Sequence, residues 1–167
     1  MVRALVRRGS ESTKAPRVAR KASPRLREPA ICRGCGASFV RRVWRKRPLT
    51  AAFFDEAAWA SCPACEQSGH GEYYGRVLAT AGDFLDREAV DRRIRNVARR
   101  AGHTQPERRI VSLDWSEGRL EVLTTSQKLA HRIARELVKA FGGRSSFRWS
   151  SDDGSLTAVW HPKARGA

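Results

Sequence analysis

The sequence lacks long apolar runs and is poor in negative charge. No stretch of about twenty consecutive apolar residues occurs, so no membrane span is predicted. Asp and Glu number 17 against 33 Lys and Arg, which leaves a net charge of +16 over 167 residues. Hydrophobic residues still make up 41% of the chain, enough for one modest core. We therefore expect a globular protein, with no membrane partner, that binds a polyanion.

A catalytic constellation is also missing. An enzyme needs a nucleophile, a base and a group that orients them, or a metal with an open position. His103, His131 and His161 are scattered through the sequence without a recognisable carboxylate partner, and His70 lies in the Gly-rich stretch SGHG. His131 is expected as a solvated side chain on the polar side of a helix. We expect no enzymatic activity, although a nucleotide-dependent activity stays open by analogy between folds.

Cysteine is confined to two pairs, in which two residues separate the members of each pair. They are Cys32 and Cys35, in CRGCG, and Cys62 and Cys65, in CPAC. This spacing lets both sulfurs of a pair reach one ion and is typical of tetrahedral zinc sites. Gly36 follows at the place where a zinc knuckle needs a left-handed backbone. Four protein sulfurs leave no coordination position open, so we expect one structural zinc ion at these cysteines.

Three other uses of four thiols compete with zinc. An iron–sulfur site stays open, since four thiolates also suit iron. Disulfides need an oxidising compartment, and without an apolar signal segment we expect a cytoplasmic location instead. A thioredoxin-like redox pair is disfavoured, because neither pair is expected to open a helix after a strand in a βαβ pattern.

Charge and periodicity divide the chain into four segments. Residues 1–30 carry nine Lys and Arg against two acids and have no apolar periodicity. They predict a disordered basic arm, which either folds onto nucleic acid or serves as an organelle transit peptide. Residues 31–74 predict a zinc ribbon, with one strand at SFVRRVW between the knuckles. Residues 75–161 predict an α+β domain, and residues 162–167 a disordered tail.

The α+β domain is predicted from alternating and helical periodicity. Strands are expected in YYGRVLATA, RRIVSLDW and GRLEVLTT, and in both halves of SSFRWSSDDGSLTAVW. Helices are expected in GDFLDREAVDRRIRNVARRAGH, with Gly102 as its stop, and in SQKLAHRIARELVKAFGG. The order is that of a ferredoxin-like split β-α-β-β-α-β domain with an extra C-terminal strand. It predicts an antiparallel sheet with both helices on one face. Trp115, Trp149 and Trp160 are expected in the core.

Basic residues gather beside an aromatic residue in the ribbon and on one face of each helix, a mixture typical of nucleic-acid binding. The primary candidates are Arg41, Arg42, Trp44, Arg45, Lys46 and Arg47 in the ribbon and Lys128, Arg132, Arg135 and Lys139 on the second helix. The secondary candidates are Arg92, Arg95 and Arg99 on the first helix. Structural interpretations stay open: Trp44 would cover the zinc core, and Glu88 with Arg92 and Asp91 with Arg95 have the spacing of intrahelical ion pairs.

These fragments also carry a family resemblance. The knuckles CRGCGASF and CPACEQSGHGEYYGRV, with GRLEVLTTSQKLAHRIARELVKAFGG and SSFRWSSDDGSLTAVW, resemble small bacterial zinc-ribbon proteins of a low-oxygen-activated locus over residues 30–161. The four cysteines and the strand–helix segment are more distantly similar to the archaeal and eukaryotic adaptor that binds the large ribosomal subunit. The resemblance implies zinc at the four cysteines. It also implies association with ribosomal RNA or the large subunit, under stress such as low oxygen. Docking to a protein partner is the alternative.

Overall fold

The computed structural model describes residues 26–80 and 85–163. The predictions for residues 1–25 and 164–167, most of the arm and most of the tail, lie outside the described residues. The described residues form four helices and nine strands. In chain order these are β1 (Ala30–Cys32), β2 (Ser38–Val40), β3 (Val43–Arg45), α1 (Ala51–Glu56), β4 (Ala58–Ala60), α2 (Pro63–His70), β5 (Gly75–Thr80), α3 (Arg87–Thr104), β6 (Ile110–Ser116), β7 (Arg119–Thr124), α4 (Gln127–Phe141), β8 (Arg144–Trp149) and β9 (Leu156–His161).

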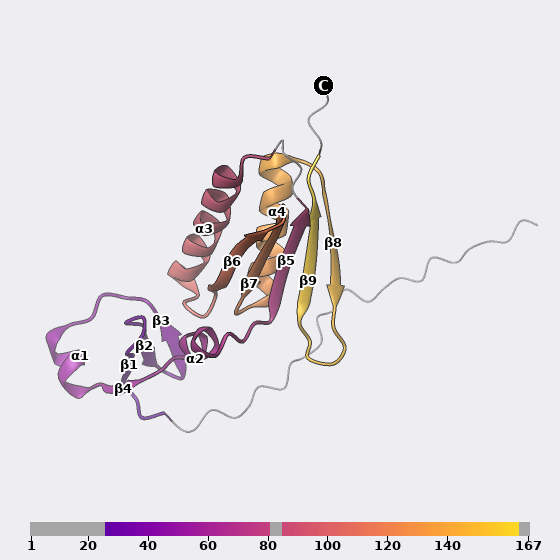
Figure 1. Ribbon diagram of the computed structural model, residues 1–167. Coiled ribbons are helices and arrows are strands. Elements are labelled where there is room, and N and C mark those ends of the chain that lie inside the picture. The colour runs from indigo at the N-terminus through magenta and orange to yellow at the C-terminus, as the bar shows by residue number, and fades with distance from the viewer. Residues whose placement is uncertain (1–25, 81–84, 164–167) are drawn as a thin grey trace, which may run out of the picture.

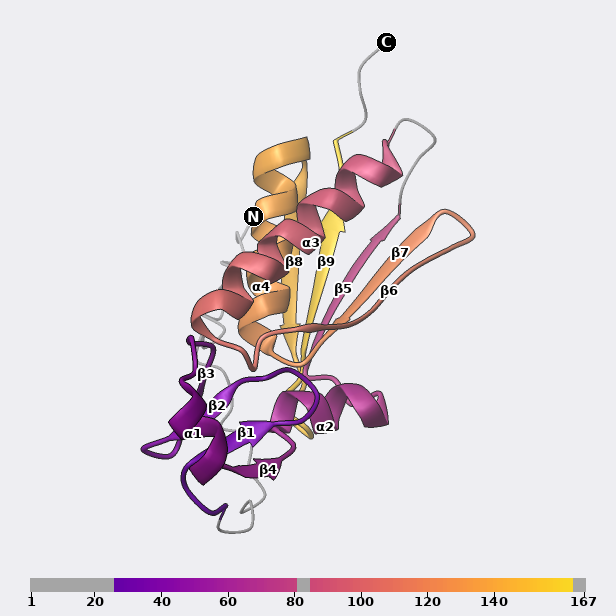
Figure 2. The same ribbon diagram turned by 90° about the vertical axis from the view of Figure 1, so that its left-hand side faces the viewer.

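The elements form two sheets, each with its own part of the chain (Figure 1). The smaller sheet has the order β3-β2-β1-β4, and the four cysteines lie at the end of β1, in the loop that follows it and at the start of α2. The larger sheet has the order β6-β7-β5-β9-β8 and is packed against α3 and α4. α2 leads from the first sheet to the second, and Figure 2 places the small sheet beyond the end of the larger one. The predicted α+β class with two parts is therefore found.

The ribbon strand predicted at SFVRRVW is wrong, because the segment folds back on itself. β2 and β3 pair antiparallel, with Val40 opposite Val43, and Arg41 and Arg42 form the turn between them. Both turn residues have positive φ, 52° and 62°, a conformation that arginine seldom adopts. The carboxylate of Glu28 stabilises this turn by accepting hydrogen bonds from both backbone N–H groups, at 2.7 and 2.9 Å.

The predicted antiparallel sheet is also wrong, because the larger sheet is mixed. The last strand, β9, lies between β5 and β8 and runs parallel to β5, while the other neighbouring strands are antiparallel. The composition of the two strands explains why β9 lies inside the sheet and β8 at its edge. β9 has one fully apolar face, with Leu156, Ala158 and Trp160 buried, and Val159 is half-buried on the other face. β8 carries mainly polar residues and suits the edge of a sheet.

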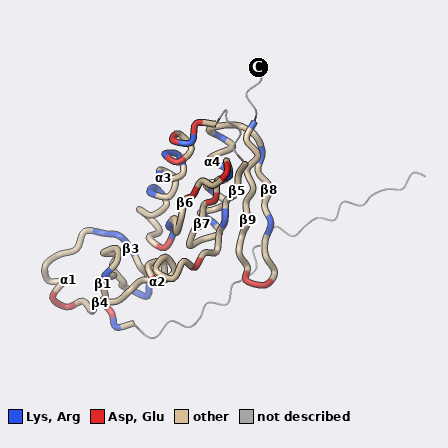
Figure 3. Tube along the Cα trace, viewed as in Figure 1, with Lys and Arg blue, Asp and Glu red and all other residues tan. Residues whose placement is uncertain are grey.

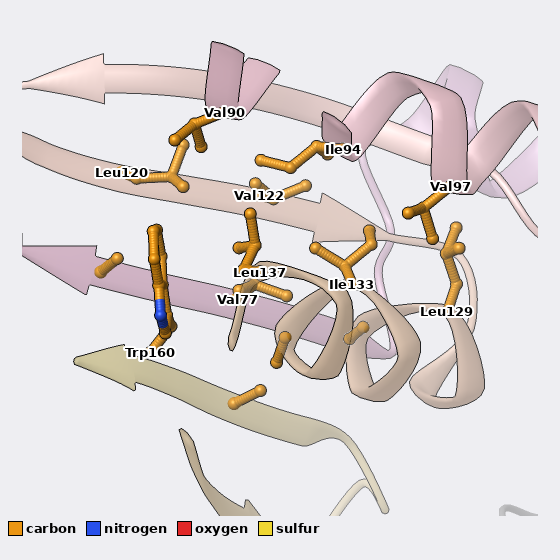
Figure 4. Close-up of a cluster of buried hydrophobic side chains, with 14 of the residues drawn as sticks. Val77, Val90, Ile94, Val97, Leu120, Val122, Leu129, Ile133, Leu137 and Trp160 are labelled. Carbon is orange, nitrogen blue, oxygen red and sulfur yellow. The ribbon is translucent and has the colours of Figure 1, made fainter. Parts of the chain in front are cut away.

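The main core lies between the larger sheet and its two helices (Figure 4). Figure 2 places α3 and α4 on one face of that sheet, as predicted. Trp160 is fully buried, and its indole Nε1 donates to the carbonyl oxygen of Gly142 at 3.0 Å. Trp115 and Trp149 are half-buried and pack against the same cluster. The prediction that the three tryptophans belong to the core is confirmed, with Trp160 at its centre.

The two long helices follow their predicted periodicity closely. α3 is capped by Asp86, whose carboxylate accepts from the N–H of Ala89 at 3.0 Å. α3 runs two residues past the predicted stop at Gly102 and ends at Thr104. Among residues 26–80 and 85–163, no helix combines the length and apolarity that crossing a bilayer requires.

Candidate metal centre and basic surface

The four cysteine sulfurs converge on one point. Their Sγ atoms all lie within 4.8 Å of one another, and no disulfide joins them. The Sγ atoms of Cys32 and Cys65 are 3.6 Å apart and those of Cys35 and Cys62 are 3.8 Å apart. A tetrahedral ion with metal–sulfur bonds of about 2.3 Å needs sulfur–sulfur distances of about 3.8 Å. The four side chains therefore fit one tetrahedral ion, as predicted.

The spacing of the sulfurs also bears on iron. A cluster of several irons separates its thiolate ligands by metal–metal distances as well as metal–sulfur bonds. Four sulfurs within 4.8 Å leave no room for such a cluster, so a single ion fits and an iron–sulfur cluster does not.

Backbone groups complete the first knuckle. Gly36 has the expected left-handed conformation, with φ of 67°, and its N–H donates to the carbonyl oxygen of Cys32 at 2.9 Å. Gly34 is required for a different reason: a Cβ there would lie 2.8 Å from the sulfur of Cys65. The N–H of Cys62 donates to the sulfur of Cys32 at 3.3 Å and joins the two knuckles. The loop glycines thus bring two distant pairs into contact.

The second cysteine pair opens a helix that was not predicted, but β4 and β5 on either side of it lie in different sheets, so it does not form the βαβ pattern of a thioredoxin-like site. β4 ends at Ala60, Cys62 is the N-cap of α2, and Pro63 occupies the first helical position. Proline is favoured there because the first helical N–H needs no partner within the helix. The redox interpretation also fails for a second reason. The sulfurs of Cys62 and Cys65 lie against those of the first pair instead of forming an isolated dithiol.

Protonation of the thiols opposes metal binding at low pH. Burial acts to raise the pKa of Cys32, but backbone N–H groups of Cys62, Gly34 and Cys35 lower it to about 7. Burial raises the pKa of Cys62, and burial together with the sulfur of Cys32 raises that of Cys65. An ion must displace these protons, so metal affinity falls with falling pH.

One residue of the α+β domain contacts the metal centre directly. The guanidinium of Arg109 donates to the sulfur of Cys65 at 3.1 Å and lies 3.9 Å from that of Cys62. Its Nε donates to the carbonyl oxygen of Pro106 at 2.8 Å, and its backbone N–H donates to the hydroxyl of Thr125 at 2.9 Å. Burial acts to lower the pKa of Arg109, but the neighbouring sulfurs raise it above its ordinary value. Arg109 thus places a fixed positive charge against the thiolates.

We expect Arg109→Gln to weaken metal binding by about 10- to 100-fold, the range for residues that support metal ligands. A divalent ion with four thiolates carries a net charge of about −2, which the guanidinium partly neutralises. Competition with a chromophoric chelator would measure the affinity. Arg108→Gln removes the same charge one residue away and should leave the affinity unchanged. Equal affinity in wild type and Arg109→Gln would contradict this role.

Trp44 lies over the cysteine cluster. It is half-buried, packs against the buried cysteines and Ala37, and its ring centroid is 5.1 Å from that of Phe39. This position fits the interpretation that Trp44 covers the small metal core. Arg47, another ribbon candidate, lies over the ring of Phe53 at 5.2 Å.

No family model, curated protein or solved structure matches this chain.

The remaining sequence candidates are exposed to solvent. Basic residues recur along α3 and in the segment that follows β3 (Figure 3). The exposed residues are Arg41, Arg42, Arg45 and Lys46 in the ribbon, Lys128, Arg132, Arg135 and Lys139 on α4, and Arg92, Arg95 and Arg99 on α3. Neither intrahelical pair expected on α3 forms within 4 Å among the described residues. Asp91 instead accepts a hydrogen bond from the indole of Trp115 at 2.8 Å.

Two hollows bring basic residues from separate elements together. A cleft of about 350 Å³ separates the ribbon from the α+β domain, and its lining includes Lys46 and Arg99. Its other basic lining residues are His103, Arg108 and Arg109. A groove of about 50 Å³ lies between α3 and α4, with Arg100 and Arg132 in its wall. Sequence reasoning missed His103, Arg108 and Arg109, because only the docking of the ribbon gives them a common setting.

His131 differs from its prediction as a solvated side chain. Its imidazole is half-buried on α4 and lies 4.4 Å from the ring centroid of Phe147 on β8. Burial, and then the charge of Arg135, lower the pKa of His131 below 6.5. Because the folded state disfavours the protonated form, this contribution to stability is present above pH 6.5 and is lost as the pH falls through the lowered pKa.

We expect Arg135→Gln to raise the pKa of His131, because the variant removes a neighbouring positive charge. A titration followed by NMR of the imidazole protons would measure it. Arg132→Gln removes an exposed charge of the same kind that does not act on His131. An unchanged pKa in Arg135→Gln would contradict the assigned cause.

Proposed function

We propose that this chain is a non-catalytic, metal-stabilised protein that binds RNA and associates with the ribosome. The observation that carries the proposal is the exposed, largely unpaired positive charge on the ribbon, α3 and α4. The described residues form two ion pairs, Arg76 with Glu121 and Arg93 with Glu136. All primary basic candidates stay outside these pairs. Such a surface attracts polyanions strongly, and the phosphate backbone of RNA is the polyanion that we propose.

The arrangement of the two helices supports the proposal further. α3 and α4 are packed side by side, and Arg100 of α3 and Arg132 of α4 line the groove between them. The carboxylate in this groove, that of Glu136, already accepts from Arg93 at 2.6 Å. The other arginines keep their N–H groups available for phosphate oxygens.

We propose zinc as the ion and a cytoplasmic location, both from the chemistry of the centre. Four thiolates in a closed tetrahedral set are typical of structural zinc. A single iron would occupy the same four sulfurs. Elemental analysis of the purified protein separates the two, and absence of colour agrees with zinc. Four free thiols also suit a reducing compartment.

The ribosome is proposed from the resemblance to the small zinc-ribbon proteins and the large-subunit adaptor. The order β-α-β-β-α-β of the α+β domain supports a ferredoxin-like relationship, in which the inserted β9 is the departure. The proposed condition for this association is low oxygen.

A sucrose gradient of the tagged protein tests the proposal, with cells grown with and without oxygen. We expect co-migration with a ribosomal subunit that is reversed by a moderate rise in salt, because the contact rests on phosphate neutralisation. A protein that stays at the top of the gradient in all conditions would contradict the ribosomal assignment. The charge control is the variant Arg41→Gln/Arg42→Gln, which lacks two ribbon arginines and is expressed in the same cells.

Protein docking is the second candidate, and one observation favours it. Phe54 on α1 and Trp59 on the edge strand β4 are 46% and 52% exposed. Large apolar side chains on a small metal-held surface are typical of contact sites. Co-migration that resists salt but is lost in Phe54→Ser/Trp59→Ser would favour docking over RNA binding.

A further inference from the structure

The cleft between the ribbon and the α+β domain is unusual in its charge. Five of its lining residues are basic or imidazole side chains, and no Asp or Glu lines it. Lys46, Arg99 and Arg108 form no ion pair among the described residues. Like charges that converge in one cleft repel each other, and a bound anion relieves that repulsion.

Stabilisation of the C-terminal end of α3 accounts for only some of these basic residues. Arg99 and His103 lie in the last turns of α3, where positive charge also offsets the helix dipole. Lys46 comes from the ribbon, and Arg108 comes from the segment before β6. Neither residue belongs to that helix end. Three separate elements thus direct basic groups to one place, and helix stabilisation explains one of them.

Hydrogen bonds fix the backbone on one side of the cleft. The N–H of Gln105 donates to the carbonyl oxygen of Ala101 at 3.0 Å, and that of Arg108 donates to the carbonyl oxygen of Gln105 at 2.9 Å. The buried hydroxyl of Thr125 donates to the carbonyl oxygen of Glu107 at 2.6 Å and accepts from the N–H of Arg109. A site fixed in advance loses little entropy when it binds.

Arg109 joins this cleft to the metal centre. Its guanidinium lines the cleft while it donates to the sulfur of Cys65. A four-thiolate centre is negatively charged and would repel an anion nearby. The guanidinium offsets that repulsion, since it carries a positive charge at the boundary between the cleft and the metal centre.

We propose that this cleft binds a phosphate group, carried by a nucleotide or by an RNA strand, through Lys46, Arg99, His103 and Arg108. Planar guanidinium groups match phosphate oxygens in geometry as well as charge. A cleft of about 350 Å³ also lies in the size range of small-molecule sites. If the phosphate belongs to an RNA strand, the inference rests on the proposed function. If it belongs to a free nucleotide, the inference needs only the cleft.

The test uses the full-length, metal-loaded chain and follows amide signals by NMR during titration. The probes are inorganic phosphate, adenosine 5′-monophosphate, and a short RNA with hydroxyl groups at both ends. We expect signals of the cleft residues to shift. The variant Arg99→Gln/Arg108→Gln should lose at least about tenfold in affinity, since two charge-assisted contacts disappear.

The matched control is Arg144→Gln/Arg148→Gln, which removes two exposed charges from β8, at the opposite edge of the sheet from β6. It should change affinity by less than about twofold, because distant exposed charges act only weakly through salt solution. Metal content and amide spectra of the free variants verify that both remain folded.

The outcomes separate this inference from the proposed function. If the RNA binds wild type and the cleft variant equally, the cleft inference is wrong and RNA binding stands. If the nucleotide binds in the cleft and the RNA binds nowhere, the cleft stands and the proposed function is wrong. No response of the cleft signals to any phosphate probe, or equal binding of a polyglutamate peptide, overturns the assignment.

Discussion

Replacing both Cys32 and Cys35 with Ser is expected to unfold the ribbon and leave the α+β domain folded. Apart from its cysteines, the buried apolar residues of the ribbon are Ala30, Ile31, Ala37 and Ala64, too little apolar surface to hold a fold. Structural zinc supplies binding free energy of about 10 kcal/mol or more to such a segment. The α+β domain has sixteen buried residues in its own cluster and does not depend on the ion.

Amide signals in an NMR spectrum measure this prediction. Those of residues 30–70 should collapse into the unfolded range in the variant, while those of Val77, Ile133 and Trp160 persist. RNA binding and ribosome association should be abolished, because the ribbon arginines lose their positions and the cleft loses Lys46. Ser61→Ala, beside Cys62 but without a sulfur contact, is the matched control. Retained association by the metal-free protein would contradict the prediction.

Reversing the charge of α4 with Arg132→Glu/Arg135→Glu/Lys139→Glu should reduce RNA affinity by at least about 100-fold at low salt. The three side chains are exposed, and they take part in no ion pair among the described residues. The helix should therefore form as before. With three fewer phosphate contacts, the slope of log affinity against log salt should fall by about 2 for a single strand. Binding measured between about 50 and about 200 mM salt gives both quantities.

The matched control carries the same change of total charge elsewhere. Arg144→Glu/Arg148→Glu/Lys163→Glu reverses three exposed residues, on β8 and just after β9. It should reduce affinity by less than about tenfold, through net charge alone. Unchanged affinity of the α4 variant at low salt would exclude its helix face from binding and point to residues 1–30.

Local patterns predicted the cysteine centre and the helices. The two Cys-x2-Cys pairs have a spacing that a single ion imposes, and the sulfurs meet as expected. α4 follows its predicted apolar stripe and lies within the predicted segment, between Ser126 and Gly142. These features depend on neighbours within a few positions, so local sequence patterns are enough to predict them.

Features that join distant segments were not predicted, because local patterns do not mark them. Arg109 is separated from Cys65 by 44 positions, and no local pattern marks it as a partner of the sulfur. The turn at Arg41 and Arg42 depends on Glu28, which was assigned to the arm. The opening of α2 was missed although Pro63 follows Cys62, a combination that favours a helix start. That signal was present in the sequence.

The position of β9 has a consequence for folding during synthesis. It is the last strand of the described chain, yet it lies inside the sheet and separates β5 from β8. Until Leu156–His161 leave the exit tunnel, α4 and β8 lack the strand that they pack against. The centre of the core also lacks Trp160 until then. A nascent chain can thus complete its metal ribbon early, whereas its α+β domain waits for the final strand. Ribosomes stalled before and after that strand emerges should carry chains that differ sharply in protease resistance.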